Sequence, residues 1–112
     1  MNAFTLSAVI ATREQTGHLY HEFLRVPTMS AGLYQLATGA SDPQEPHTED
    51  EVYYIVQGQA QIQVGKEDMP VKAGSIVFVA ANVDHRFHSI TEDLTVLVFF
   101  APAEYSRSDT RG

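Results

Sequence analysis

The chain has 112 residues, no cysteine, and a formal charge of −7, because 14 acidic residues outnumber seven lysines and arginines. This length fits one domain with its own core, and the acidic balance without a basic cluster argues against binding to nucleic acids or anionic membranes. The missing cysteines exclude disulfides, thiolate metal sites and a cysteine nucleophile, so the expected partner is a small molecule or a cation held by histidine and oxygen donors.

The first 19 residues hold a short apolar stretch with no basic residues before it and no clear cleavage site. We therefore expect neither a signal peptide nor a membrane span, and a cytoplasmic protein. Residues 1–19 are interpreted as a strand or an arm in a dimer, ahead of the main domain.

Residues 20–102 form a series of short β-prone runs separated by Gly, Pro, Asn and Asp. The runs read LYHEFLRV, AGLYQLA, EVYYIV, AQIQV, SIVFV, HRFHSI and LTVLVFF. Their spacing predicts an all-β sandwich or barrel with no long helix. Residues 103–112 show no pattern, so we expect a frayed C-terminal tail.

The faces of these runs differ. Residues 59–64 alternate between Gln and apolar side chains, as in a strand half exposed to water, whereas IVFV and TVLVFF are apolar on both faces. Such strands in a short chain need cover on the outside, from a second sheet edge or from another subunit. We expect a homodimer.

The stretch EPHTEDE places a histidine among carboxylates just before an apolar run. In a regular strand Glu45, His47, Glu49 and Glu51 would share one side. Packed carboxylates repel one another, and a divalent cation among them would remove that cost, since imidazole and carboxylate suit Fe, Mn, Ni, Cu or Zn. Spacing alone leaves a metal site and an ordinary solvated turn both open.

A second histidine cluster, DHRFHSI, follows on another predicted strand. His85, Phe87 and Ser89 share one face of it, and His88 lies on the other face. Only one of the two histidines can point inward, and we interpret His88 as structural or facing the surface.

Both stretches resemble the signatures of the cupin family. In EPHTEDEVYYIVQG, His47 falls on the second His of the first signature, Glu51 on its Glu and Gly58 on its closing Gly. Glu45 stands where the family has its first His.

The second signature resembles GSIVFVAANVDHRFHS, with Gly74 on its Gly and His85 on its His. Ala80 replaces a Pro, Asn82 replaces the turn Gly and Ser89 replaces an Asn. Asn tolerates positive φ better than other residues with a side chain, so we expect the turn at Asn82 to survive.

The resemblance covers roughly residues 30–101. It implies an all-β fold with a single cupin β-barrel, the double-stranded β-helix or jelly roll. It also implies one divalent metal ion (Fe, Mn, Ni or Zn) held by His47, Glu51 and His85, a set like a facial triad with open positions. Glu45 is the candidate fourth ligand, with Gln44 and Glu49 as substitutes; otherwise Glu49 and Asp50 form a solvated loop.

The same resemblance implies a mostly apolar pocket inside the barrel for a small organic molecule. By strand parity its lining should include Tyr53, Ile55, Ile62 and Phe87, and Tyr34 on an earlier strand is a candidate polar contact, as are Tyr20, Arg25 and Gln35.

Two functions remain open at this stage. One is a metal-dependent enzyme of the dioxygenase or isomerase and lyase type, in which reaction class rests on family analogy. The other is a barrel that binds or senses a small ligand or a metal without turnover.

Overall fold

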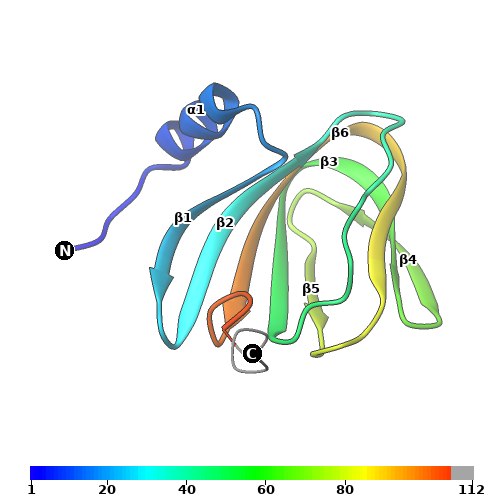
Figure 1. Ribbon diagram of the computed structural model, residues 1–112. Helices are drawn as coiled ribbons and strands as arrows, with labels where there is room; N and C mark the ends of the chain where they lie inside the picture. Colours follow the sequence, from blue (N-terminus) through cyan, green and yellow to red (C-terminus); the bar gives the residue numbers. More distant parts are fainter. Residues whose placement is uncertain (107–112) are drawn as a thin grey trace.

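The computed structural model describes residues 1–106. Within them lie one helix and six strands: α1 (Leu6–Thr16), β1 (Tyr20–Val26), β2 (Met29–Leu36), β3 (Asp50–Val64), β4 (Glu67–Lys72), β5 (Ile76–Val79) and β6 (His85–Ala101). The strands form one antiparallel sheet in the order β1-β2-β6-β3-β4, and β5 pairs with β3. The expected all-β barrel is confirmed (Figure 1).

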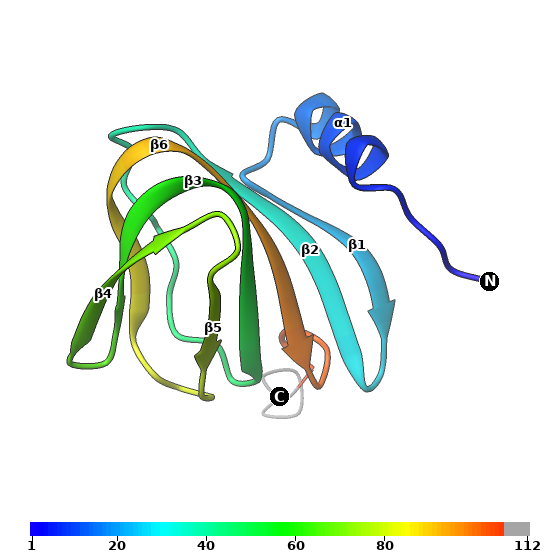
Figure 2. The same cartoon turned by 180° about the vertical axis from the view of Figure 1, so that it is seen from behind.

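The two long strands, β3 and β6, arch over and curl the sheet into the barrel (Figures 1 and 2). Their pairing shifts register around Gly58, which has a φ of 104°. A Cβ on Gly58 would lie 2.4 Å from the carbonyl oxygen of Asp93 on β6. The sequence predicted separate runs on either side of Gly58 and of Asp93, but both residues lie at bulged or bent points inside the continuous strands β3 and β6.

The bulge in β3 also changes which side of the strand faces the core. Glu51, Tyr53 and Ile55 are buried before it, whereas Ala60 and Ile62 are buried after it. A regular strand would turn Ile62 to the outside, since successive side chains alternate. The irregular backbone therefore keeps one continuous core along a bent strand.

Two elements were not expected from the sequence. Residues 6–16 form a helix and not a strand, and Gly17 ends it with a φ of 72°. The role of this region as an arm in a dimer stays a prediction. Phe4 and Val9 attach this region to the barrel, Phe4 through an edge contact with Phe23 on β1, 5.0 Å between ring centroids. β4 contains Pro70, which an edge strand tolerates because it needs no inner hydrogen bond there. Across residues 1–106 no helix is long and apolar enough to cross a membrane.

The segment after β6 returns to the barrel. Ala103 and Glu104 are buried, and the Glu104 amide donates a 2.9 Å hydrogen bond to Oγ of Ser30. Residues 103–106 are therefore fixed at the end of the barrel, where the sequence predicted a frayed tail; the remainder of that predicted tail, 107–112, lies outside the described residues.

Candidate metal centre

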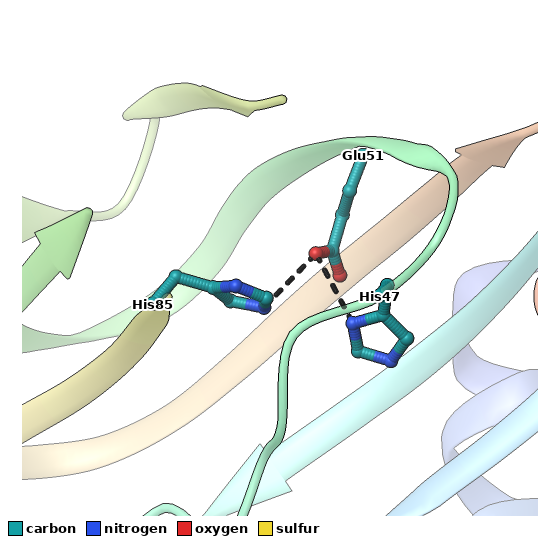
Figure 3. Close-up of side chains that lie close together, drawn as sticks. All are labelled: His47, Glu51 and His85. Carbon is teal, nitrogen blue, oxygen red and sulfur yellow. Dashed lines mark ion pairs between the residues drawn. The ribbon is translucent and has the colours of Figure 1, made fainter. Parts of the chain in front are cut away.

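Three side chains from separate parts of the chain converge at one end of the barrel (Figure 3). Glu51 lies near the start of β3, His85 is the first residue of β6, and His47 comes from the loop before β3. One possible ligand atom from each lies within 4.8 Å of the others. All three residues are buried, at 7% exposure for His47, 1% for Glu51 and 5% for His85.

The turn before β6 brings His47 and His85 together. Asn82 has a φ of 66°, the left-handed conformation expected at this position, and its amide donates a 2.7 Å hydrogen bond to the carbonyl of His47. The neighbouring Ala81 amide donates to Oδ1 of Asp50 over 2.9 Å. This turn therefore ties the loop that carries His47 to the strand that carries His85.

Each histidine uses one ring nitrogen as a donor, and this fixes where its lone pair lies. Nδ1 of His85 lies 2.9 Å from the carbonyl oxygen of Val83, which only accepts, so Nδ1 carries the hydrogen. Nε2 of His47 lies 2.8 Å from Oε2 of Glu104, an acceptor carboxylate, so Nε2 carries the hydrogen. In the neutral rings the lone pairs are thus on His85 Nε2 and His47 Nδ1.

Both lone pairs face the same carboxylate oxygen. Oε1 of Glu51 lies 3.1 Å from Nε2 of His85 and 3.7 Å from Nδ1 of His47. These atoms and Oε2 of Glu51 are buried and have no hydrogen-bond partner within residues 1–106. Buried polar atoms without partners are costly, so a proton or a cation in the centre would stabilise the arrangement.

A proton can take part of that role. Burial lowers the pKa of His85, but the contact with Glu51 and the hydrogen bond to Val83 outweigh it, so that its pKa is raised above the ordinary value. A metal ion satisfies more of the group, since two imidazoles and one carboxylate match the ligands preferred by Fe, Mn, Ni and Zn. The donor set therefore fits a divalent metal.

Glu45 lies outside this group, although it was the predicted fourth ligand. It is exposed on the wall of the adjacent cavity. Residues 42–47 form no strand, so the alternation that placed Glu45 beside His47 and Glu51 does not apply to them.

The other two candidates for a fourth ligand, Glu49 and Gln44, make hydrogen bonds to other residues. Glu49 is 1% exposed, not solvated as predicted, and its Oε1 accepts a 2.7 Å hydrogen bond from the Tyr105 amide. Oε1 of Gln44 accepts a 2.9 Å hydrogen bond from the hydroxyl of Tyr53. Neither side chain joins the three converging residues.

A cavity of about 430 Å³ opens beside the cluster, with His47 and Glu51 in its wall. Its other lining residues are Leu19, Tyr20, Tyr34, Pro43, Gln44, Glu45, Val98, Phe100, Glu104 and Tyr105. Among the predicted pocket residues, Tyr34 lines it. The other four fill the core at 0–1% exposure instead, because the barrel interior is packed: Tyr53, Ile55, Ile62 and Phe87.

Two cavity residues gain importance from the structure. The hydroxyl of Tyr20 is buried without a hydrogen-bond partner in the described part of the chain, and the residue also lines the cavity. Glu104 was missed altogether, since it lies beyond the last strand and no spacing pattern connects it to His47. The only feature of the sequence that marks Glu104 is its charge, since it is the one acidic residue in APAEYS.

Comparisons with known proteins agree with the fold. The family model of the cupin domain matches residues 32–100. An uncharacterized protein of Streptomyces coelicolor is 50% identical over 104 residues, which cover 93% of this chain and 99% of that protein.

Solved structures share the fold at lower identity. The TT1209 protein from Thermus thermophilus has a TM-score of 0.75 at 22% identity, covering 92% of this chain and 99% of the other. An RmlC-like cupin from Shewanella frigidimarina has a TM-score of 0.68 at 22% identity, covering 81% and 78% of the two chains.

Proposed function

The chain belongs to the cupin domain family, and from that premise we propose that it holds one divalent metal ion between His47, Glu51 and His85. The observation that carries the proposal is the convergence of two imidazole lone pairs on one buried carboxylate oxygen. Three protein ligands leave positions free for a small molecule, as in other facial sites with two histidines and a carboxylate.

We further propose that the protein is a metal-dependent enzyme acting on a small organic molecule, of the dioxygenase or isomerase and lyase type. A bound metal supplies Lewis-acid polarisation or, if it is iron, activation of O₂. The cavity would bring a substrate to the metal, because it reaches two of the ligands, His47 and Glu51, and is large enough for a small molecule. Phe100 and the tyrosines that line the cavity would pack against that substrate.

A non-catalytic module that binds or senses a small ligand or a metal is the alternative. It uses the same cavity and the same ligands but needs no reaction. The two functions differ in one measurable property, which is whether a bound small molecule is converted to a product in the presence of the metal.

Metal analysis of protein purified without a histidine tag tests the metal site first. We expect close to one equivalent after incubation with Fe²⁺ or Mn²⁺ and removal of the excess. Substoichiometric metal in the wild type, together with a His47→Ala variant of unchanged metal content and thermal stability, would show that the proposal is wrong.

Turnover separates the enzyme from the binding module. Protein loaded with Fe²⁺ under anaerobic conditions is mixed with a panel of diketones, catechols and thiols, and both O₂ consumption and product formation are followed. O₂ consumption indicates a dioxygenase, and product without O₂ consumption indicates an isomerase or lyase. Binding without either supports the sensing alternative.

The homodimer remains a proposal, and an exposed apolar face supports it. Tyr54 on β3 pairs with Ile76 on β5, and both are exposed, at 40% and 71%. Phe78 and Met69 lie beside Ile76 at 60% and 53% exposure. An apolar face of this kind is commonly covered by another subunit, and sedimentation equilibrium of the wild type against Phe78→Glu tests whether it is.

A further inference from the structure

We infer that Glu104 is a positioning residue for the metal ligand His47, and that its carboxylate selects the ring orientation that presents Nδ1 to Glu51 and His85. This inference rests on the proposed metal site. The contact behind it is the 2.8 Å separation between Oε2 of Glu104 and Nε2 of His47, the ring nitrogen on the far side from Glu51.

The backbone of Glu104 is held firmly enough to fix its side chain. Its amide donates to Oγ of Ser30 over 2.9 Å, and its carbonyl accepts from the guanidinium of Arg25 over 2.9 Å. The next residue, Tyr105, donates its amide to Oε1 of Glu49 over 2.7 Å. These bonds tie the segment to the β1–β2 hairpin and to the loop that carries His47.

The ring of His47 is already confined between aromatic neighbours. Its centroid lies 4.7 Å from that of Phe100 and 5.7 Å from that of Tyr105. Apolar walls restrict the ring plane, but they do not distinguish a ring from the same ring flipped by half a turn. The flip exchanges each nitrogen with a carbon, so only a directional polar contact can select one orientation.

Glu104 provides that contact. In the observed orientation Nε2–H donates to Glu104 and the Nδ1 lone pair faces Oε1 of Glu51. In the flipped orientation a ring carbon would face each carboxylate, and no ring nitrogen would face the cluster. A carboxylate that accepts from a ligating histidine also raises the basicity of the nitrogen that binds the metal.

A purely structural ion pair is the competing explanation. The Glu104 side chain is 11% exposed, and a carboxylate this buried requires a partner whether or not a metal is present. The two roles differ in what a substitution changes. A structural pair affects the stability of the metal-free protein, whereas a positioning residue affects metal affinity and the tautomer of His47.

Titration of the metal-free protein with Co²⁺, followed by its visible absorption, tests the inference. We expect Glu104→Gln to raise the Co²⁺ dissociation constant by about 10–100-fold, which is the usual effect of losing such a partner. The absorption spectrum of the bound Co²⁺ should keep its shape. Glu45→Gln removes the same charge from the same cavity wall and is the matched control; it should bind as the wild type does.

The tautomer of His47 gives a second readout that needs no metal. Long-range ¹H–¹⁵N spectra of the metal-free protein should show a hydrogen on Nε2 in the wild type and in Glu45→Gln, and a mixture of tautomers in Glu104→Gln. This readout remains informative even where the variant loses some stability.

The outcomes separate the two proposals. Wild-type protein that binds no Co²⁺ overturns the metal site and the role of Glu104 with it. Wild-type protein that binds Co²⁺ only as tightly as Glu104→Gln leaves the metal site intact and overturns the inference. A Co²⁺ spectrum of altered shape in Glu104→Gln would make Glu104 a direct ligand, which also contradicts a positioning role.

Discussion

His85 and His88 lie on the same strand, β6, but they differ in how many of their ring nitrogens have a hydrogen-bond partner among residues 1–106. Nε2 of His88 lies 2.9 and 3.0 Å from the two carboxylate oxygens of Asp68, and its Nδ1 lies 3.0 Å from Oγ of Ser89. Nε2 of His85 is buried against Glu51 with no hydrogen bond. The difference teaches that an unsatisfied, buried ring nitrogen supports the proposed metal site, whereas the mere presence of a histidine does not.

Exchanging the two histidines for alanine is the most direct way to break this comparison. We expect His85→Ala to lower metal affinity by more than about 100-fold, because the loss of a ligand should exceed the 10–100-fold effect of an outer partner. His88→Ala should keep the wild-type affinity. Isothermal titration with Mn²⁺ measures both, and equal losses in the two variants would contradict the assignment.

The second prediction concerns β6, the strand that carries both histidines, and its backbone contact with Gly58 on β3. Gly58→Ala would force a Cβ to within 2.4 Å of the Asp93 carbonyl at a φ of 104°, so we expect a loss of about 3 kcal/mol or more from strain and collision together. Gly74→Ala has a similar φ of 94° but meets open space, and should cost about 1–3 kcal/mol from strain alone. Urea unfolding compares the two, and equal losses would mean that the contact with β6 does not matter.

Metal removal tests the comparison between His85 and His88 through the stability of the protein, with the strands unchanged. At a free metal concentration of 100 times the dissociation constant, the wild type should gain about 2.7 kcal/mol of stability over the chelator-treated protein. His88→Ala should gain the same amount and His85→Ala almost nothing. Thermal melts with Mn²⁺ or with EDTA measure the gain, and a gain in His85→Ala would place the metal elsewhere.

The smallest effect is expected at the surface pair. His88 and Asp68 are 36% and 47% exposed at their side chains, and surface ion pairs contribute about 0–1 kcal/mol. Asp68→Asn should therefore change the free energy of unfolding by less than about 1 kcal/mol and leave metal affinity unchanged. Urea unfolding and the Mn²⁺ titration check both expectations.

The fold and the three converging residues could be predicted from the sequence, because His47, Glu51 and His85 stand at matching positions of two motifs with the right spacing. It could not settle Glu45, since alternation predicts side-chain direction only where the backbone is a strand, and residues 42–47 are not. Glu104 was out of reach for a different reason. Its partner is set by how the chain returns after β6, a long-range contact that leaves no periodic signal.

The lengths of the strands were also beyond the sequence. Gly58 and the stretch around Asp93 have the amino-acid composition of turns. In the folded chain their backbones are in contact, and β3 and β6 bend there without ending. Local composition cannot distinguish a bulge from a turn when both use glycine at positive φ.

The attachment of Glu104 has a consequence for how such sites diversify. This residue lies past the last paired residue of β6, so replacement or lengthening of residues 102–106 would alter the surroundings of His47 while every strand kept its pairing. The candidate site thus has two parts, one built into β3 and β6 and one supplied by the segment that follows β6. A protein engineer could vary Glu104 to change the surroundings of His47, provided that Ala103, which is buried in the core, is kept.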